Sequence, residues 1–198
     1  MTPAASDLKA TLRRQLREEA CRHTPAERKV ASEQICLRLR EQESWQLARS
    51  ILFFAPLVEE PDVWRLVSEA LNEGKTVALP RYSRSRKDYE AGQIENPDRQ
   101  LQIGYFGIRE PDETCPIILW NKLDFVLVPG IGFALDGGRL GRGKGYYDRL
   151  LARVSGMKCG VAFDWQVTAK IPAEPHDIRL DCILTPTRWH PVVPLRRF

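Results

Sequence analysis

The N-terminal part of the chain carries leucines at helical spacing. They recur every four residues, which places them on one face of a helix: Leu8, Leu12 and Leu16. We expect this helix over residues 6–22, with Ser6 or Asp7 as its N-cap.

Two further helices are indicated by the residues at their ends. Thr24, Pro25 and Glu27 supply a capping hydroxyl, a proline at the first helical position and a carboxylate three residues after the cap. A helix is therefore predicted from this point to about Gln42. Another is predicted from about residue 61 to 73, because apolar residues recur at helical spacing and a glycine follows where a helix commonly stops.

Short apolar runs rich in strand-forming residues follow the first two helices. Five of them predict buried strands: Ile51–Ala55, Thr76–Leu79, Phe125–Val128, Cys159–Phe163 and Cys182–Leu184. We predict a single α/β domain over residues 1–198, with a mostly parallel central sheet, helices on both of its faces and two N-terminal helices. Ligands of such sheets bind beyond the carboxyl ends of the strands, so functional residues should follow the strands.

Two segments fit this scheme poorly. Residues 83–122 have weak periodicity and many Ser, Arg, Asp, Asn, Pro and Gly residues, so we expect loops and short strands there. The proline-rich end beyond Thr185 is predicted to be a tail packed on the surface.

The composition, with 43% hydrophobic and 28% charged residues, is that of a folded soluble domain. The apolar runs are far shorter than the roughly 20 residues of a membrane span, and the charged N-terminus lacks the apolar core of a secretory signal. We therefore expect a cytoplasmic protein with no membrane partner, and we take it to be a monomer. The five cysteines form neither a CxxC pair nor a zinc-like spacing, so we interpret them as reduced, mostly buried side chains.

The most informative segment is GGRLGRGKGYYDRLL, residues 137–151, which follows a predicted strand and leads into an apparent helix. Its alternating glycines leave backbone N–H groups unobstructed: Gly141, Gly143 and Gly145. The interleaved cations Arg139, Arg142 and Lys144, and the N-terminal dipole of the helix, add positive potential. These features predict a phosphate-binding loop, and they are less well explained by a tight strand-to-helix connection alone.

The loop matches neither of two common nucleotide-binding patterns. It satisfies the first seven positions of the Walker A pattern, but Gly145 stands where a Ser or Thr must hold magnesium. No three glycines have the spacing of the dinucleotide-binding fingerprint. The net charge of +4 is modest and largely distributed, so we expect a phosphate-bearing small molecule rather than a nucleic acid as the partner.

Three segments together resemble a known family: LVPGIGF, the glycine-rich segment and PAEPHDIRLDCILT resemble the 5-formyltetrahydrofolate cyclo-ligases, also called methenyltetrahydrofolate synthetases. The resemblance extends in order from KATLR at residues 9–13, through EEPDV and ALPRY, to the last predicted strand. It implies a ligase that uses ATP and Mg²⁺. In such an enzyme the formyl oxygen of 5-formyltetrahydrofolate is phosphorylated, N10 attacks the activated carbon, and 5,10-methenyltetrahydrofolate, ADP and phosphate are formed.

The resemblance also implies which residues bind the nucleotide and the metal. Those that contact ATP would be Lys9, Arg13, Arg139, Leu140, Gly141, Arg142, Gly143, Lys144, Gly145, Tyr146 and Tyr147. Arg142, Lys144 and Tyr146 would be the catalytic residues, the first two by stabilising the transferring phosphoryl group. Asp148 and Asp177 would hold the magnesium ion, since hard carboxylates beside phosphate suit it. Without the resemblance, Asp148 is equally well interpreted as a residue that favours the positive end of its helix.

The folate would be bound by residues that follow the strands. The resemblance implies Leu57, Glu60, Arg81, Phe106 and Tyr146. The carboxylate of Glu60 would accept paired hydrogen bonds from the pterin ring. One departure from the family is Ala134, where many members carry an aspartate, so residues 134–138 are expected to be arranged differently.

Two other functions stay open at this point. One is a different ATP-using or phosphate-binding enzyme on the same scaffold, because a fold does not fix the chemistry. The other is a non-catalytic module that binds nucleotide or RNA through its basic loops. The carboxylates of Glu60, Asp148 and Asp177 argue against the second, because they repel a polyanion unless a metal intervenes.

Overall fold

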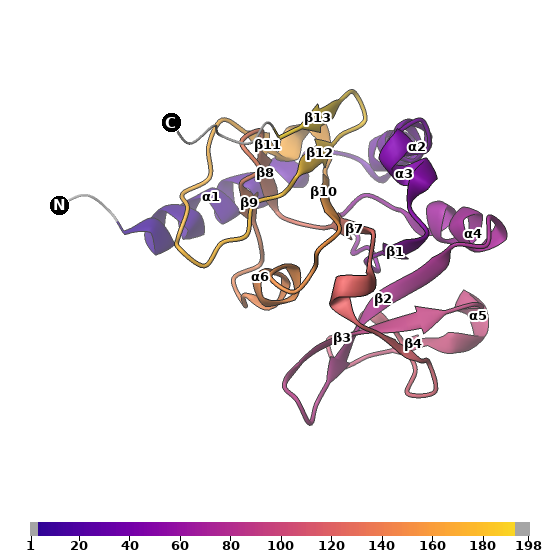
Figure 1. The fold of residues 1–198 in the computed structure, drawn as a ribbon. Helices are drawn as coiled ribbons and strands as arrows, with labels where there is room; N and C mark the ends of the chain where they lie inside the picture. The colour runs from indigo at the N-terminus through magenta and orange to yellow at the C-terminus, as the bar shows by residue number, and fades with distance from the viewer. Residues whose placement is uncertain (1–3, 193–198) are drawn as a thin grey trace, which may run out of the picture.

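A computed structural model describes residues 4–192 of the chain. Its centre is an eight-stranded sheet in the order β13-β12-β10-β7-β1-β2-β3-β6 (Figure 1). The five strands from β12 to β2 are parallel to one another. The outer pairings, of β13 with β12, of β3 with β2 and of β6 with β3, are antiparallel. The inner strands are β1 (Ser50–Leu52), β2 (Thr76–Ser83), β7 (Phe125–Val128), β10 (Met157–Val161) and β12 (Cys182–Leu184). The predicted mostly parallel sheet is therefore confirmed.

Helices cover both faces of this sheet (Figure 1). The helices are α1 (Ala5–Ala20), α2 (Pro25–Arg40), α3 (Glu43–Leu47), α4 (Trp64–Asn72), α5 (Pro97–Gln100) and α6 (Tyr146–Leu151). Residues of α2, α3 and α4 share one buried cluster with Ile51 and Leu127, whereas residues of α6 share another with Leu52 and Val126. Neighbouring residues of β1 and β7 thus serve opposite faces, as the pleat of a strand requires.

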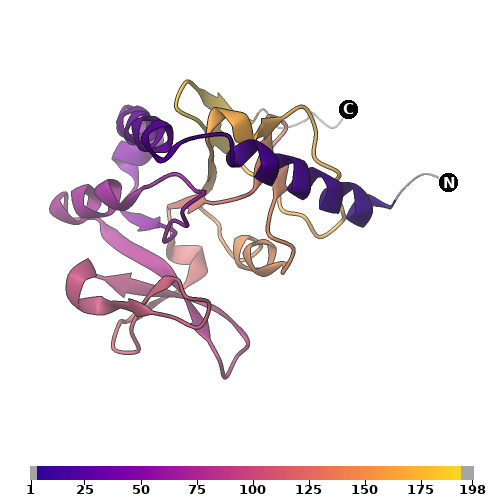
Figure 2. The same ribbon diagram turned by 180° about the vertical axis from the view of Figure 1, so that it is seen from behind.

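Helix α1 lies against a second, three-stranded sheet. This sheet has the order β11-β8-β9, formed by β8 (Gly132–Ala134), β9 (Arg139–Leu140) and β11 (Val167–Thr168). Leu12 and Leu16 of α1 pack on its buried cluster, and Figure 2 shows the helix lying across this part of the molecule. This contact explains the spacing of Leu12 and Leu16, whereas Leu8 is exposed. The N-cap is not Ser6 or Asp7 but Ala4, whose side chain makes no capping hydrogen bond.

The segment between residues 83 and 122 occupies the lower part of the molecule in Figure 1, and its part outside the central sheet forms a smaller layer. β3 (Asp88–Ile94) pairs with β2 along seven residues, and β6 (Ile117–Ile118) pairs with β3. β4 (Leu101–Ile103) and β5 (Arg109–Pro111) form a separate antiparallel ribbon. Loops and short strands were expected here, but β3 is a long strand of the central sheet.

The other predictions agree with the structure in part. The Thr24 capping box is present, and Gly74, with φ +73°, follows α4. The end beyond Thr185 is not only a surface tail, because β13 (Trp189–Pro191) pairs with β12; residues 193–198 lie outside the described part.

All five cysteines are free thiols and four are buried, Cys21 being exposed. Within residues 4–192 no helix is both long and apolar enough to cross a membrane. That residues 1–198 form one domain stays a prediction.

Lys75 ties the end of α3 to the start of β2, and this contact can be tested. Its buried ammonium donates to the backbone oxygens of Trp45, Gln46 and Ala48 at 2.9–3.2 Å. Lys75→Met should lower the free energy of unfolding by about 1.5–3 kcal/mol, because the three backbone carbonyls lose their charged hydrogen-bond donor. Urea denaturation measures the change, with the exposed Lys29→Met as control. Equal effects of the two substitutions would contradict the assignment.

Candidate active site

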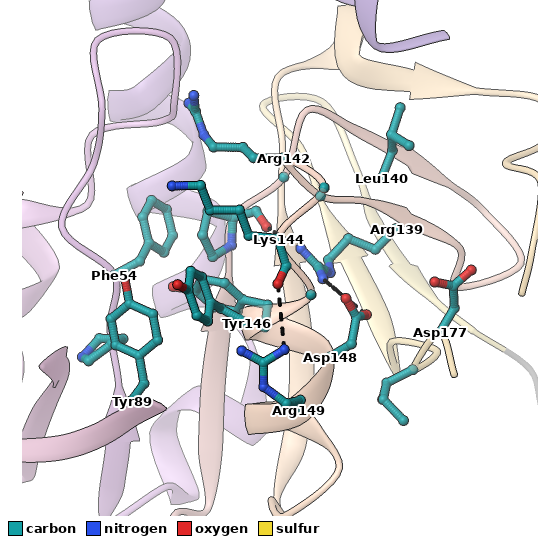
Figure 3. Close-up of a pocket in the computed structure, with 18 of the residues that line it drawn as sticks. Phe54, Tyr89, Arg139, Leu140, Arg142, Lys144, Tyr146, Asp148, Arg149 and Asp177 are labelled. Atoms are coloured by element: carbon teal, nitrogen blue, oxygen red, sulfur yellow. Dashed lines mark hydrogen bonds and ion pairs between the residues drawn. The ribbon is translucent and has the colours of Figure 1, made fainter. Parts of the chain in front are cut away.

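A large cavity lies beside the carboxyl ends of β1 and β7, with a volume of about 1160 Å³ (Figure 3). Separate parts of the chain line it, among them α1, the segments after β1 and β7, the segment that leads into β5, the glycine-rich loop with α6, and residues 174–178. It therefore lies where a parallel sheet is expected to bind ligands. The predicted site residues that line it are Lys9, Arg13, Leu57, Glu60, Phe106, Arg139, Leu140, Gly141, Arg142, Gly143, Lys144, Gly145, Tyr146, Tyr147, Asp148 and Asp177.

Arg81 is the exception, because it is not among the residues that line the cavity. Its guanidinium donates to Glu90 Oε2 at 3.2 Å and to the backbone oxygen of Asp112. These contacts tie β2 to β3 and to the chain that follows β5. Arg81 is therefore the one predicted site residue that the structure does not bring to the cavity, and its contact with a ligand stays a prediction.

The glycine-rich loop between β9 and α6 is shaped by two glycines. Gly143 and Gly145 have φ values of +98° and +66°, a region that residues with a side chain rarely adopt. Arg13 of α1 reaches the loop, and its Nε donates to the backbone oxygen of Gly141 at 2.8 Å. The helix packed on the small sheet thus also holds the loop in place. The preceding turn, at Ala134, is closed by Asp136, whose Oδ1 accepts from the Gly138 N–H at 3.0 Å.

Asp148 is held by an arginine rather than by the end of its helix. Arg139 Nη2 donates to both carboxylate oxygens of Asp148, each at 3.1 Å (Figure 3). The Arg139 side chain is only 4% exposed, and its guanidinium lies 5.4 Å from the centre of the Tyr147 ring. Its Nε is buried without a hydrogen-bond partner among the described residues. Asp148 thus neutralises a buried cation and makes no capping hydrogen bond, although it lies in the first turn of α6.

Lys9 lies between two carboxylates at the opposite end of the chain. Its Nζ is 2.6 Å from Glu174 Oε2 and 2.6 Å from Asp177 Oδ2. Burial opposes the ionisation of Lys9 and of Asp177, but the hydrogen bonds between charged groups outweigh this effect. The pKa of Lys9 is therefore raised above its ordinary value, and the pKa of Asp177 is held below its ordinary value.

Glu60 is a buried carboxyl group in the cavity wall after β1. Its Oε2 accepts from the Leu57 N–H at 3.1 Å, and its Oε1 lies 3.4 Å from Arg142 Nη2. The side chain is 8% exposed, and this burial raises its pKa, although the Leu57 N–H and Arg142 oppose the shift. Arg142 also lies 3.7 Å from Glu59. One cation of the glycine-rich loop thus reaches across the cavity to Glu60.

Aromatic rings form the third part of the wall. Phe106 and Tyr146 have ring centres 5.7 Å apart, and Tyr89 lies 5.3 Å from Tyr146. Lys144 Nζ is 4.5 Å from the centre of the Phe106 ring. Tyr89 and Tyr146 lie near one another in Figure 3. A flat ligand can pack against such rings, and a cation of the same loop stands beside them.

Reasoning from the sequence missed several lining residues, and among those with titratable side chains are Tyr89, Glu110 and Glu174. Glu174 had a signal, because it stands three residues before Asp177 in the PAEPHD segment. Tyr89 and Glu110 had none, since they lie in the segment without clear periodicity. Their place in the wall depends on the pairing of β3 with β2 and of β5 with β4.

The donor set of the cavity suits a magnesium ion. Asp148, Glu174 and Asp177 all line it, and Mg²⁺ prefers carboxylate oxygens. Glu174, His176 and Asp177 each offer one ligand atom, and these atoms lie within 4.8 Å of one another. His176 fits the ion less well because Mg²⁺ favours oxygen. The carboxylates are paired with Arg139 and Lys9, so a metal would share its ligands with these cations.

The pairing of Lys9 with two carboxylates predicts how stability varies with pH. Lys9→Met should lower the free energy of unfolding near pH 7 by about 1–3 kcal/mol, between the values for exposed and buried pairs. Since the folded-state pKa of Asp177 is depressed, its contribution is present above the unfolded value of about 3.9 and is lost as the pH falls through the lower folded value.

Denaturation at several pH values, without ligand, tests this dependence. The difference between wild type and Lys9→Met should persist through neutral pH and narrow below about pH 4. Lys170→Met, at an exposed position, is the control. If the difference in the free energy of unfolding does not vary with pH, the ion pairs of Lys9 with Glu174 and Asp177 do not account for the effect of the substitution.

Comparison with known proteins agrees with the motifs in the sequence. The model of the 5-formyltetrahydrofolate cyclo-ligase family matches residues 5–186. The 5-formyltetrahydrofolate cyclo-ligase of Mycolicibacterium smegmatis is 34% identical over 150 residues, which are 71% of this chain and 75% of that protein. The enzyme of the same name from Mus musculus is 27% identical over 187 residues, covering 89% and 92%.

A solved structure extends the comparison to the fold. The NMR structure of 5,10-methenyltetrahydrofolate synthetase from Aquifex aeolicus has a TM-score of 0.86 and 32% sequence identity, covering 96% of each chain. Since the family model spans most of the sequence and the fold of a family member spans nearly all of it, the chain belongs to the 5-formyltetrahydrofolate cyclo-ligase family.

Proposed function

We propose that this protein converts 5-formyltetrahydrofolate to 5,10-methenyltetrahydrofolate at the expense of ATP, in the presence of Mg²⁺. The single observation that carries the proposal is that a cationic glycine-rich loop and a wall of aromatic rings with a buried carboxyl group line one cavity. A polyphosphate and a flat heterocycle can therefore be held side by side. We further propose that it acts as a cytoplasmic monomer, without a nucleic-acid or membrane partner.

The nucleotide half of the proposed site is the loop from Arg139 to Tyr147 together with α1. Its backbone N–H groups and its cations suit phosphate oxygens. Arg13 already holds the loop, and Lys9 stands beside the carboxylates that would share the metal. In this proposal Lys9 and Arg13 contact the ATP phosphates from the helix, while Arg142 and Lys144 contact them from the loop.

The folate half is formed by Leu57, Glu60, Phe106 and Tyr146. Leu57 and Phe106 offer apolar surface to the flat ring, and Glu60 offers a carboxyl group whose orientation is fixed by the Leu57 N–H. Tyr146 belongs to the loop and also touches the aromatic wall, so it lies at the junction of the two halves. Arg81 is left out of the proposed site because its guanidinium ties strands together.

The reaction requires the two substrates to be aligned and charge to be neutralised. The formyl oxygen attacks the γ-phosphorus of ATP, and ADP leaves with the electrons of the broken P–O bond. N10 then attacks the activated formyl carbon; N10 loses its proton, and phosphate departs with the former formyl oxygen. Arg142 and Lys144 would stabilise the negative charge that shifts between phosphoryl oxygens, while the cavity holds the reacting groups in place.

Magnesium, when bound, would neutralise and orient the ATP phosphates. Asp148 and Asp177 are the proposed ligands, and Glu174 is a further carboxylate beside Asp177. Because Arg139 and Lys9 hold these carboxylates in fixed positions, the protein's own cations pre-orient the proposed metal ligands.

The proposed function is tested by an absorbance assay. The purified protein is mixed with 5-formyltetrahydrofolate, ATP and Mg²⁺, and the conjugated methenyl product is followed where the substrate does not absorb. Formation of ADP is measured in the same samples. We expect no methenyl product when 5-formyltetrahydrofolate, ATP or Mg²⁺ is omitted. When all three are present, the amount of methenyl product should equal the amount of ADP. ADP without methenyl product would favour another ATP-using enzyme on this scaffold.

Lys144→Ala should leave the fold intact and slow turnover by about 10²–10³-fold, as when one preorganised charge-stabilising donor is removed. The reason is that the lysine would act most strongly where phosphoryl charge shifts, so kcat should fall more than KM rises. Steady-state kinetics with each substrate varied measure the split, and Lys170→Ala is the surface control. Wild-type kinetics in a folded Lys144→Ala variant would remove this residue from the mechanism.

Asp148 and Asp177 should behave as a unit if they hold one ion. Either Asp→Asn substitution should raise the Mg²⁺ concentration needed for half-maximal activity, because an anionic oxygen is lost. The double variant should be much more active than the product of the two single losses implies. Titration of Mg²⁺ at saturating ATP tests this, with the exposed Asp98→Asn as control. Multiplicative losses with unchanged Mg²⁺ dependence would exclude a shared ion.

A further inference from the structure

A second buried carboxyl group lines the cavity and has no part in the proposed reaction so far. Glu110, in the middle of β5, is only 4% exposed, yet it lies in the same cavity wall as Glu60 and Phe106. The chain reaches it through the turn that begins at Gly104 and carries Phe106. Glu110 therefore belongs to the folate half of the cavity, at the side formed by the smaller layer of the molecule.

Only one oxygen of this carboxyl group has a partner. Glu110 Oε2 accepts a hydrogen bond from the Tyr82 N–H at 3.1 Å. Oε1 is buried and has no hydrogen-bond partner among the described residues. The cation that favours its charge is Arg81, but that guanidinium is bonded to Glu90 and to the Asp112 carbonyl. Burial is the largest influence on Glu110 and raises its pKa.

The surrounding backbone is fitted closely to the carboxyl group. A Cβ atom at Gly104 would overlap the carboxyl carbon and Oε2 of Glu110 and would lie 2.8 Å from its Cγ. Position 104 is therefore open only to glycine while Glu110 keeps this conformation. A buried acceptor without a partner destabilises a protein, and an apolar side chain would fill the position without that cost. The arrangement is explained if a ligand supplies the missing donor.

Glu60, which lines the same cavity, shows a similar arrangement. There too, Oε2 is held by a backbone N–H, that of Leu57, and Oε1 is left for a charged or polar partner, at present Arg142. In both residues a backbone N–H fixes one carboxylate oxygen, and the other oxygen has no backbone partner among the described residues. Such pre-orientation reduces what a ligand must order on binding.

We propose that Glu110 is a second substrate-binding carboxyl group, whose Oε1 accepts a hydrogen bond from an N–H group of the folate ring opposite Glu60. The inference rests on the proposed function, since it takes its ligand from there. A reduced pterin carries several N–H donors on its rim, so two carboxyl groups can hold one ring by different edges. Glu110 thereby fixes the orientation of the ring in its plane, which sets where the formyl group points.

The test is direct binding of 5-formyltetrahydrofolate, without ATP, to wild type and to Glu110→Gln. Glutamine keeps the shape of the side chain and can still accept from the Tyr82 N–H, but it then turns an NH₂ donor toward the ligand. The dissociation constant for 5-formyltetrahydrofolate should rise about 10- to 100-fold, as expected for one hydrogen bond to a charged acceptor. Affinity for ATP should stay within about twofold, and thermal stability should not fall, since the Tyr82 N–H keeps its acceptor and the buried side chain can no longer ionise.

Two further variants complete the design. Glu90→Gln is the matched control, because Glu90 is a neighbouring carboxylate that pairs with Arg81 and does not line the cavity; its folate affinity should be that of wild type. Glu110→Asp keeps the charge but withdraws the acceptor by one methylene, so its folate affinity should also fall. It tests the role of Glu110 in folate binding if the glutamine variant does not fold. Glu60→Gln, which removes the other proposed folate contact, serves as the positive control.

The possible outcomes separate the inference from the function on which it rests. If wild type binds 5-formyltetrahydrofolate and both Glu110 variants bind it equally well, the inference is wrong and the proposed function stands. If the Glu110 variants lose affinity for folate and ATP alike, the carboxyl group is structural and the inference is again wrong. If wild type does not bind 5-formyltetrahydrofolate at all, the proposed function fails first.

Discussion

The cavity depends on the pairing of three of its cations with carboxylates from other parts of the chain. Arg139 is bonded to Asp148, Lys9 to Asp177, and Arg142 to Glu60. Without these partners, cations brought to one place would repel one another and resist burial. The same pairs join α1 to the segment before β12, β9 to α6, and the glycine-rich loop to the end of β1. Charge balance therefore holds the site together as well as preparing it for anions.

The strength of these ion pairs differs from one cation to the next, and this difference explains why the cavity suits a charged ligand. Arg142 lies 3.4 Å from Glu60, at the long end of hydrogen-bond distances, and is half-exposed, so its pairing is weak in water. Lys144 rests on an aromatic ring and forms no ion pair among residues 4–192. Arg139, in contrast, is buried and held by two bonds. The loop thus combines a fixed cation with two that can be redirected.

What could be predicted from the sequence was local or depended on a recognisable motif. The capping box at Thr24 and the strands β7 and β12 follow from neighbouring residues, and all were predicted at their observed positions. The glycine-rich loop was identified by its own composition. By contrast, Lys9 was expected to meet phosphates, but its contact with Asp177, 168 residues away, depends on how α1 packs. Arg81 could not be placed because its orientation is set by β3 and the chain after β5, for which the sequence had no clear pattern.

The close fit of Gly104 against Glu110 constrains how this family member can change during evolution. A side chain at position 104 would overlap the carboxyl group of Glu110 in its present conformation, so a substitution there requires the Glu110 side chain to move. A shorter residue at 110 would remove the collision, but it would also leave the Tyr82 N–H without its acceptor. The two positions therefore cannot drift independently: the order of substitution matters, and each reversal becomes harder once the other position has changed.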